Sequence, residues 1–307
     1  MYDLAILGGG PAGVAAGVYA ARKKLKTVFI TESFGGQSTE SGGIENWIGT
    51  INISGVDLGK ALENHLRAYA NQTIEIITGK RITRVSKIEG GFKIDAGTNS
   101  YESRTVLVAT GSTRKKLDIP GADIYENKGI TYCASCDGPL FAGQDVAVIG
   151  GGNAGFESAA QLLMYCKSVT LLNRRNEFRA DEMTVEKVLA HPNMKVVMGA
   201  TPKEIRGDKF VNSIIYTDAK TGEDHELPIA GVFVEIGLIP TTNFVAGLIE
   251  LNPTNQIPVD PKNQRTHVPG VWAAGDCTDG LYHQNNIAAG DAVKALEDIY
   301  LFIHAGK

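Results

Sequence analysis

Cysteine is scarce in this chain: among 307 residues there are four, and only Cys133 and Cys136 are close neighbours. A secreted scaffold held together by disulfides would be far denser in cysteine, which argues against that class of protein. A zinc site needs further ligands at a suitable spacing, and the sequence contains no two histidines separated by three to five residues. The pair therefore indicates redox chemistry rather than a structural cross-link or a metal site.

Long apolar runs and a strong excess of one charge are also missing. Met1-Tyr2-Asp3 leads directly into the apolar residues 4–7, without the basic segment and long apolar core of a signal peptide. No stretch reaches the ~18 apolar residues that a membrane-spanning helix requires. The net charge of -4 does not favour a nucleic acid or a membrane surface as a partner. We expect a cytoplasmic protein that binds neither.

The chain is longer than a typical single domain of ~100–200 residues, and it contains one plan twice. Residues 4–7 and 146–149 are apolar strands that run into the glycine-rich loops 8–13 and 150–155. An alanine-rich helical stretch follows each loop, over 14–21 and 158–163, and an apolar strand follows each helix, over 27–30 and 169–172. This order of strand, loop, helix and strand is typical of a parallel sheet that binds a nucleotide.

Both copies continue and close in the same way. Alternating polar and apolar residues predict antiparallel strands, over 81–85 and 92–94 in the first copy and over 210–216 and around 227 in the second. An apolar strand ending in glycine closes each copy, over 106–111 and 232–237. A further strand over 271–274 has no glycine-rich loop of its own, so we expect the chain to return to the first domain.

The predicted fold is therefore α/β, with two doubly wound Rossmann-like nucleotide-binding domains (three-layer ββα), one inserted in the other. The first domain is expected over 1–112 and 243–307, and the second over 113–242. In each loop the first glycine makes a tight turn, the second lets a pyrophosphate approach the backbone, and the third lets helix and strand pack. These glycines are Gly8, Gly10 and Gly13 in the first loop and Gly150, Gly152 and Gly155 in the second.

The residue after the second strand of each copy separates the two ligands. Glu32 offers a carboxylate to ribose hydroxyls, as a dinucleotide without a 2′-phosphate requires. The matching place in the second copy holds Asn173, followed by Arg174, Arg175 and Arg179, whose guanidinium groups suit a phosphate. The alternative is a solvated basic helix end. In this position the cluster favours NADP(H) over NAD(H).

Cys133 and Cys136 lie fourteen residues before the second loop. Thiol–disulfide exchange needs an attacking thiolate and a nearby resolving thiol, and a two-residue spacer supplies both. Asp137 follows at once and places a carboxyl where it can move a proton to or from a thiolate. Cys166 and Cys277 are expected to be structural.

These features together resemble the low-molecular-weight thioredoxin reductases, which are class II flavoprotein pyridine nucleotide-disulfide oxidoreductases, over essentially the whole chain. The segments that carry the resemblance, besides the two loops, are Gly35-Gly36-Gln37, Glu45-Asn46-Trp47, Ala109-Thr110-Gly111, 133–138, 173–179 and 273–276.

The resemblance implies FAD in the discontinuous domain and NADPH in the inserted one. The residues implied for FAD are Gly8, Gly10, Pro11, Ala12, Gly13, Glu32, Gly36, Gln37, Asn46, Thr110, Gly111, Gly275, Asp276 and Gln284. Those implied for NADPH are Gly150, Gly152, Asn153, Ala154, Gly155, Arg174, Arg175 and Arg179. Cys136 would be the thiol nearest the flavin, Cys133 the thiol that attacks the substrate, and Asp137 the acid–base. A homodimer and a rotation between the two domains are also implied.

The expected activity is the reduction of thioredoxin or a thioredoxin-like protein by NADPH through FAD and the Cys133–Cys136 disulfide. Two residues depart from the family pattern: Asn173 replaces a histidine, and His283 replaces an arginine before Gln284. The chain also resembles the reductase component of alkyl hydroperoxide reductase. That relative has an additional N-terminal redox domain, whereas the first strand here begins almost at residue 1, so a free-standing thioredoxin is expected.

Alternative functions remain open at this point. One is a disulfide reductase of the same fold that takes electrons from NADH or ferredoxin, or that serves a peroxiredoxin-type partner. Another is a nucleotide-sensing protein without enzymatic activity.

Overall fold

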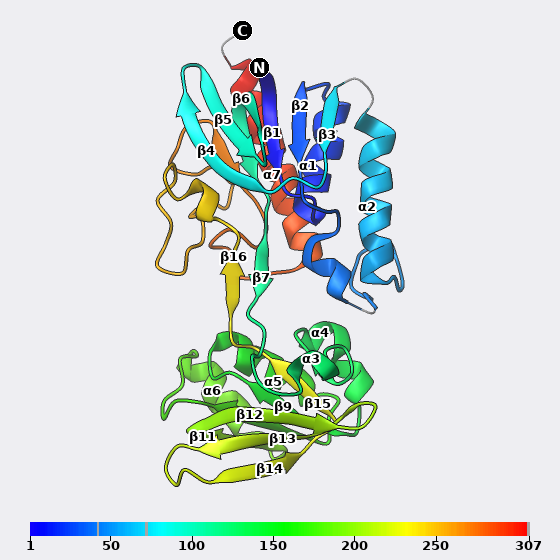
Figure 1. Cartoon of the computed structure of the whole chain (residues 1–307), viewed down its shortest axis with the longest axis vertical. Coiled ribbons are helices and arrows are strands. Elements are labelled where there is room, and N and C mark those ends of the chain that lie inside the picture. The colour runs from blue at the N-terminus through cyan, green and yellow to red at the C-terminus, as the bar shows by residue number, and fades with distance from the viewer. Residues whose placement is uncertain (42, 71–72, 306–307) are drawn as a thin grey trace. The chain divides into compact units, whose positions relative to one another are not determined.

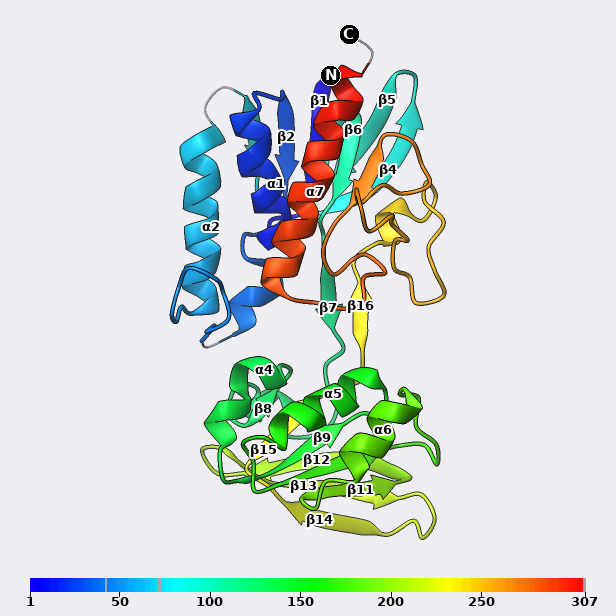
Figure 2. The same ribbon diagram turned by 180° about the vertical axis from the view of Figure 1, so that it is seen from behind.

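The computed structural model describes residues 1–41, 43–70 and 73–305. The chain divides into two compact units (Figures 1 and 2). Unit 1 comprises Met1–Thr113 and Ile239–Lys307, and unit 2 comprises Arg114–Leu238. The two passages of the chain between the units lie within short strands, β7 (Ser112–Arg114) and β16 (Leu238–Pro240). The second unit is thus an insertion in the first.

Unit 1 is built on a sheet in the order β3-β2-β1-β6-β5-β4, with β17 paired to β6. Its strands are β1 (Tyr2–Leu7), β2 (Thr27–Ile30), β3 (Ile74–Ile77), β4 (Ile82–Ile88), β5 (Gly91–Ala96), β6 (Asn99–Val108) and β17 (Val271–Ala273). Its helices are α1 (Pro11–Arg22), α2 (Gly55–Ala70) and α7 (Asn285–His304), with the 3-10 helices η1 (Gly36–Glu40) and η3 (Asn243–Val245). Strand β1 is parallel to its neighbours β2 and β6, whereas β4 and β5 are antiparallel to each other. Helices α1, α2 and α7 lie together beside this sheet (Figures 1 and 2).

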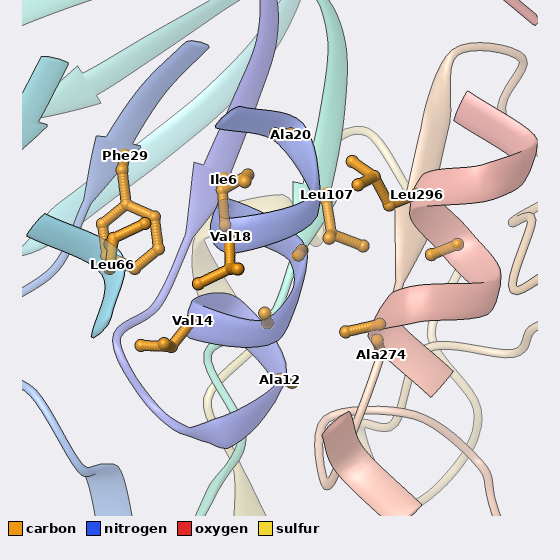
Figure 3. Packing of buried hydrophobic residues seen from close by; sticks show 14 of the residues in the cluster. Ile6, Ala12, Val14, Val18, Ala20, Phe29, Leu66, Leu107, Ala274 and Leu296 are labelled. Carbon is orange, nitrogen blue, oxygen red and sulfur yellow. The ribbon is translucent and has the colours of Figure 1, made fainter. Parts of the chain in front are cut away.

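Both faces of the central strands are buried, which explains why their sequences are continuously apolar. Leu4 and Ile6 of β1 pack in one cluster with side chains of α1, α2 and α7. Figure 3 shows Val18 of α1 within that cluster, near Phe29 of β2. Ala5 and Leu7 face the other way, into a second cluster that includes residues of β4 and β5.

Unit 2 repeats this plan with a sheet in the order β11-β10-β9-β15-β8. These strands are β8 (Ile130–Thr131), β9 (Asp145–Ile149), β10 (Ser168–Asn173), β11 (Met194–Met198) and β15 (Gly231–Val234). An antiparallel meander follows, β12 (Ala200–Gly207), β13 (Val211–Asp218) and β14 (Asp224–Pro228). The helices are α3 (Ala122–Tyr125), α4 (Ala134–Asp137), α5 (Asn153–Leu162) and α6 (Glu182–Leu189), with the 3-10 helix η2 (Gly138–Phe141).

Alternate residues of β9 define the three layers of unit 2. Val146 and Val148 pack against Phe156 and Leu162 of α5. Ala147 and Ile149 pack in a different cluster, which includes buried residues of β12 and β13. The parallel sheet therefore lies between helices on one side and the meander on the other.

The predicted α/β fold with two Rossmann-like units is confirmed. The helix expected over 158–163 begins earlier, at Asn153, because the backbone turns into the helix directly after Gly152. Likewise α1 begins at Pro11. Backbone N–H groups in the first helical turn have no partner within the helix, so proline, which has no N–H, is suited to this position. No helix within the described residues has the length and apolarity to cross a membrane.

Candidate active site and nucleotide-binding loops

In the first glycine-rich loop, Gly8 and Gly13 pack tightly against neighbouring backbone, whereas Gly10 borders open space. Gly8 has a φ of +120°, and a Cβ there would lie 2.2 Å from the carbonyl oxygen of Ala109. A Cβ on Gly13 would lie 1.9 Å from the carbonyl oxygen of Gly8. A Cβ on Gly10, in contrast, would meet nothing within 4 Å. The open side lies at the start of α1, where backbone N–H groups and the helix dipole favour an anionic group.

A cavity of about 770 Å³ opens from this loop. Its volume lies within the range of cofactor sites in proteins. Of the residues proposed for FAD, the following line it: Gly8, Gly10, Pro11, Ala12, Glu32, Gly36, Gln37, Thr110, Gly111, Gly275 and Asp276. The elements that supply them come from both pieces of unit 1. The residues present therefore fit a dinucleotide with a pyrophosphate.

The other residues proposed for FAD are placed differently. Gly13 packs behind the loop, as its close approach to Gly8 requires. Asn46 Nδ2 donates a hydrogen bond of 3.1 Å to Gln284 Oε1, and neither residue lines the cavity. Asp276 lies 3.5 Å from His283 Nδ1, so the histidine that departs from the family pattern has a carboxylate neighbour.

The second glycine-rich loop has the same geometry as the first. Gly150 has a φ of +129°, and a Cβ there would lie 2.2 Å from the carbonyl oxygen of Glu235. A Cβ on Gly155 would lie 1.9 Å from the carbonyl oxygen of Gly150, while a Cβ on Gly152 would meet nothing within 4 Å. Asn153 and Ala154 form the exposed start of α5. This loop also fits a pyrophosphate.

The arginine cluster follows a buried asparagine. Asn173 Nδ2 donates hydrogen bonds to the carbonyl oxygens of Arg175 (3.0 Å) and Glu177 (2.9 Å). The backbone N–H of Arg179 donates to the carbonyl oxygen of Gly151 (2.8 Å), which joins this segment to the loop. Arg174, Arg175 and Arg179 are exposed, and among the described residues none of the three forms an ion pair with a carboxylate. Asn173 thus organises the basic segment, a role that its position in the sequence did not reveal.

Cys133 and Cys136 form a disulfide at the start of the short helix α4. Cys133 caps the helix, because the backbone N–H of Cys136 approaches Cys133 Sγ (3.2 Å) and that of Asp137 donates to the Cys133 carbonyl oxygen (3.0 Å). Both cysteines are partly exposed. The helical turn therefore brings the two sulfurs together and leaves the pair accessible to a partner.

Asp137 is held beside this disulfide by Thr131, a buried residue at the end of β8. The Thr131 hydroxyl donates a hydrogen bond to Asp137 Oδ2, and it also accepts one of 3.4 Å from the backbone N–H of Cys133. Burial raises the pKa of Asp137, and the Thr131 hydrogen bond and the charge of Arg114 oppose that rise. Thr131 was not predicted as a site residue; its only sequence signal is its place two residues before Cys133.

A second partly buried carboxyl, Glu235, lies beside the second loop and was missed by sequence reasoning. Glu235 follows directly after β15, and Ser158 Oγ of α5 donates a hydrogen bond of 2.7 Å to its Oε1. Burial raises the pKa of Glu235 to about 7; the Ser158 hydrogen bond and Arg114 lower it, and Glu157 raises it.

The two remaining cysteines are buried. Burial raises the pKa of Cys166 to about 11 and that of Cys277 to about 12, so neither thiol is a ready nucleophile. Within the described ranges, no three or more His, Cys, Asp or Glu side chains gather as the ligands of a metal ion would.

Comparison with known proteins gives the family. Residues 2–292 match the family model of pyridine nucleotide-disulphide oxidoreductases, and the chain belongs to this family. The chain is therefore an oxidoreductase of a family that uses FAD and a pyridine nucleotide. A solved structure of thioredoxin reductase from Streptococcus pyogenes is 32% identical, covers 99% of both chains and superposes with a TM-score of 0.90.

Two curated relatives have other names. The chain is 41% identical over 294 residues to an NADH dehydrogenase of Bacillus subtilis, a match that covers 96% of this chain and 57% of the relative. It is also 41% identical over 297 residues to the F component of alkyl hydroperoxide reductase of Pseudomonas putida, covering 96% of this chain and 56% of the relative. The chain thus spans little more than half the length of these curated relatives.

Proposed function

We propose that this chain is a thioredoxin reductase, which transfers electrons from NADPH, through FAD and the Cys133–Cys136 disulfide, to the disulfide of a thioredoxin-like protein. The observation that carries the proposal is one arrangement within unit 2. There a partly exposed disulfide lies beside a partly buried carboxyl, Asp137, in the same unit as a nucleotide loop followed by exposed arginines.

FAD would be held in unit 1 and would supply two-electron chemistry between the nucleotide and the disulfide. The open face at Gly10 would receive its pyrophosphate, and the Glu32 carboxylate would accept hydrogen bonds from ribose hydroxyls. Asp276, which also lines the cavity, would hold the ribityl–phosphate region.

The nucleotide would bind unit 2 with its pyrophosphate over Gly152. Arg174 and Arg175 then offer charge-assisted hydrogen bonds to a 2′-phosphate, which NADPH has and NADH lacks. Since no described carboxylate pairs with these arginines, their charge is available to the ligand. We therefore propose a preference for NADPH.

The thiols of the reduced protein carry out the exchange. The Cys133 thiolate attacks one sulfur of the partner's disulfide, and the other sulfur of the partner leaves as a thiolate that takes up a proton. The Cys136 thiolate then attacks Cys133 Sγ, which restores the Cys133–Cys136 disulfide and releases the partner's second thiol. Two electrons pass to the partner, and Asp137 exchanges the protons. We also propose a homodimer and a cytoplasmic location for this enzyme.

Anaerobic titration of the purified holoprotein with NADPH, and separately with NADH, tests the electron path. We expect NADPH to bleach the flavin absorbance at lower concentration, with an uptake of electrons greater than the flavin alone can hold. Cys136→Ser should reduce that uptake to the flavin's own share. Absence of bleaching by either nucleotide would contradict the proposal and favour a donor such as ferredoxin.

A second candidate partner is a peroxiredoxin-type protein, which the similarity to the F component of alkyl hydroperoxide reductase favours. NADPH and NADH oxidation should be compared with two acceptors, a thioredoxin and a peroxiredoxin with its peroxide. Turnover with thioredoxin alone supports the proposed function. Turnover with the peroxiredoxin alone, or with NADH in preference, would replace it by this second candidate.

A further inference from the structure

Three positions around the second glycine-rich loop carry polar side chains where the first loop has alanine. Paired with their equivalents in unit 1, they are Glu157 for Ala15, Ser158 for Ala16 and Glu235 for Ala109. The last equivalence also holds in three dimensions. The carbonyl oxygen of Ala109 lies 2.2 Å from the Cβ position of Gly8, and that of Glu235 lies 2.2 Å from the Cβ position of Gly150. Since unit 1 has the same fold with alanine at these positions, the fold does not require polar residues there. We therefore relate Glu157, Ser158 and Glu235 to the ligand of unit 2.

Glu235 lies at the topological switch point of the sheet in unit 2. In the strand order β10-β9-β15, the two neighbours of β9 are reached by chain connections that run in opposite directions, and ligands bind at the carboxyl ends of such strands. Glu235 is the first residue after the carboxyl end of β15. Its side chain is half-buried and fixed by the hydrogen bond from Ser158.

The order of the strands assigns each part of a dinucleotide to one strand end. The exposed arginines after β10 suit the phosphate on the adenosine half, and the loop after β9 suits the pyrophosphate. The remaining half of the ligand, which carries the nicotinamide, must then extend over the end of β15. On this reasoning, which rests on the proposed function, Glu235 lies in the part of the site that receives the nicotinamide.

We propose that Glu235 is a specificity-determining residue of the nucleotide site, whose ionised carboxylate favours the oxidised, cationic nicotinamide over the reduced, neutral one. FAD bound in unit 1 would supply the hydride acceptor, and loss of a hydride, with its two electrons, would leave the nicotinamide ring with a positive charge. A carboxylate nearby in a partly desolvated site attracts that charge, whereas it gains much less from the neutral ring. The carboxylate therefore favours hydride donation and retains the oxidised nucleotide more tightly.

The charge of Glu235 depends on pH in the range where it would act, because burial raises its pKa to about 7. Arg114 and Glu157 are the charged groups that face it, the first favouring and the second opposing ionisation. Binding of the oxidised nucleotide relative to the reduced one should therefore strengthen as pH rises through this range. Both redox states of the ligand carry the 2′-phosphate. The contribution of its contacts with the arginines to the binding free energy therefore cancels when the two dissociation constants are compared.

The test measures two dissociation constants on the oxidised holoprotein by titration calorimetry. The ligands are NADP+ and 1,4,5,6-tetrahydro-NADP, an analogue whose nicotinamide ring is uncharged and cannot donate a hydride. For the wild type we expect the preference for NADP+ to grow about tenfold between about pH 6 and about pH 8.5. In Glu235→Gln, whose amide retains an acceptor for Ser158, the preference should be small and independent of pH.

Two controls separate this effect from a general change in the unit. The first control is Glu226→Gln. Glu226 also accepts a hydrogen bond from a serine, Ser213 (2.6 Å), but lies on the meander strands. This variant should leave both dissociation constants unchanged. Adenosine 2′,5′-bisphosphate, which lacks the nicotinamide, should bind wild type and Glu235→Gln equally. A pH-dependent preference that persists in Glu235→Gln overturns the inference alone. Failure of the wild type to bind NADP+ or NAD+ overturns the proposed function and the inference with it.

Discussion

The buried side-chain amide of Asn173 donates a hydrogen bond of 3.0 Å to the backbone carbonyl oxygen of Arg175. A buried residue thereby fixes the path of the segment that carries the exposed arginines. The Cβ position of Gly151 lies 2.5 Å from Asn173 Oδ1, so the same side chain also packs tightly against the glycine-rich loop.

Replacement of Asn173 by alanine should therefore weaken both stability and nucleotide binding. The carbonyl oxygens of Arg175 and Glu177 lose their donor, which should lower the free energy of unfolding by about 1–3 kcal/mol. Denaturant unfolding and the affinity for NADP+ measure the two effects. Asn173→His tests the residue usual in the family and should retain more affinity than alanine. If Asn173→Ala binds NADP+ as the wild type does, the amide does not organise the basic segment.

Removal of the guanidinium groups should change the choice of nucleotide without changing the fold. In Arg174→Ala/Arg175→Ala, loss of the charge-assisted hydrogen bonds should weaken NADPH binding by about 10–100-fold, while NADH binding stays nearly constant. The ratio of the two apparent Michaelis constants measures this. The exposed Arg206, which pairs with Glu204 on the meander, provides the matched control through Arg206→Ala. An equal loss for both nucleotides would contradict the assignment of the cluster to a 2′-phosphate.

The two kinds of glycine in the first loop should respond differently to substitution. Gly10→Val adds a side chain in open space, at a φ of -76° that valine tolerates, so apoprotein stability should be retained while bound flavin is lost. Gly13→Ala places a Cβ 1.9 Å from the carbonyl oxygen of Gly8, so it should destabilise the apoprotein itself. Flavin absorbance per protein and thermal unfolding of the apoprotein separate the outcomes. Gly10→Val with its flavin retained would place the cofactor elsewhere.

The internal repeat made the fold predictable from the sequence. Residues 4–7 and 146–149 each precede a glycine-rich loop, and strands buried on both faces have continuously apolar sequences, so architecture and parallel pairing followed directly. Side-chain contacts across long separations had no such signal. Glu235 is 77 residues from Ser158, and neither residue type reveals that the two meet or that burial raises the pKa of the carboxyl.

The hydrogen bond from Thr131 should set the proton affinity of Asp137. The hydroxyl stabilises the ionised carboxylate, so Thr131→Val, which keeps the shape and removes the donor, should raise the pKa of Asp137 further. Carbon NMR of labelled aspartates in the wild type and in Asp137→Asn identifies the resonance and follows its titration. Thr131→Ser restores the donor and should restore the wild-type pKa. An Asp137 resonance that titrates identically in Thr131→Val would rule out this coupling.

The same logic predicts that Glu235 costs stability at neutral and higher pH. Its pKa in the folded protein is about 7, above the ordinary value of 4.5, so its contribution to stability is fully present below pH 4.5 and is lost as pH rises through 7. Glu235→Gln removes this dependence. The variant should be more stable than the wild type by about 1–3 kcal/mol at about pH 8, and the difference should shrink towards zero near about pH 5.

Thermal unfolding of wild type and variant, matched in flavin content, at the two pH values measures this difference. Glu226→Gln again serves as the control, because that glutamate also accepts from a serine but lies on the meander strand β14, away from the loop, and its effect should be similar at both pH values. A gain for Glu235→Gln that is equal at both pH values would mean that packing rather than ionisation is responsible. A gain confined to the higher pH would show that ionisation of the Glu235 carboxyl, beside the nucleotide loop, lowers the stability of the folded protein. Ala109, at the equivalent position of unit 1, has no carboxyl and therefore no such loss of stability.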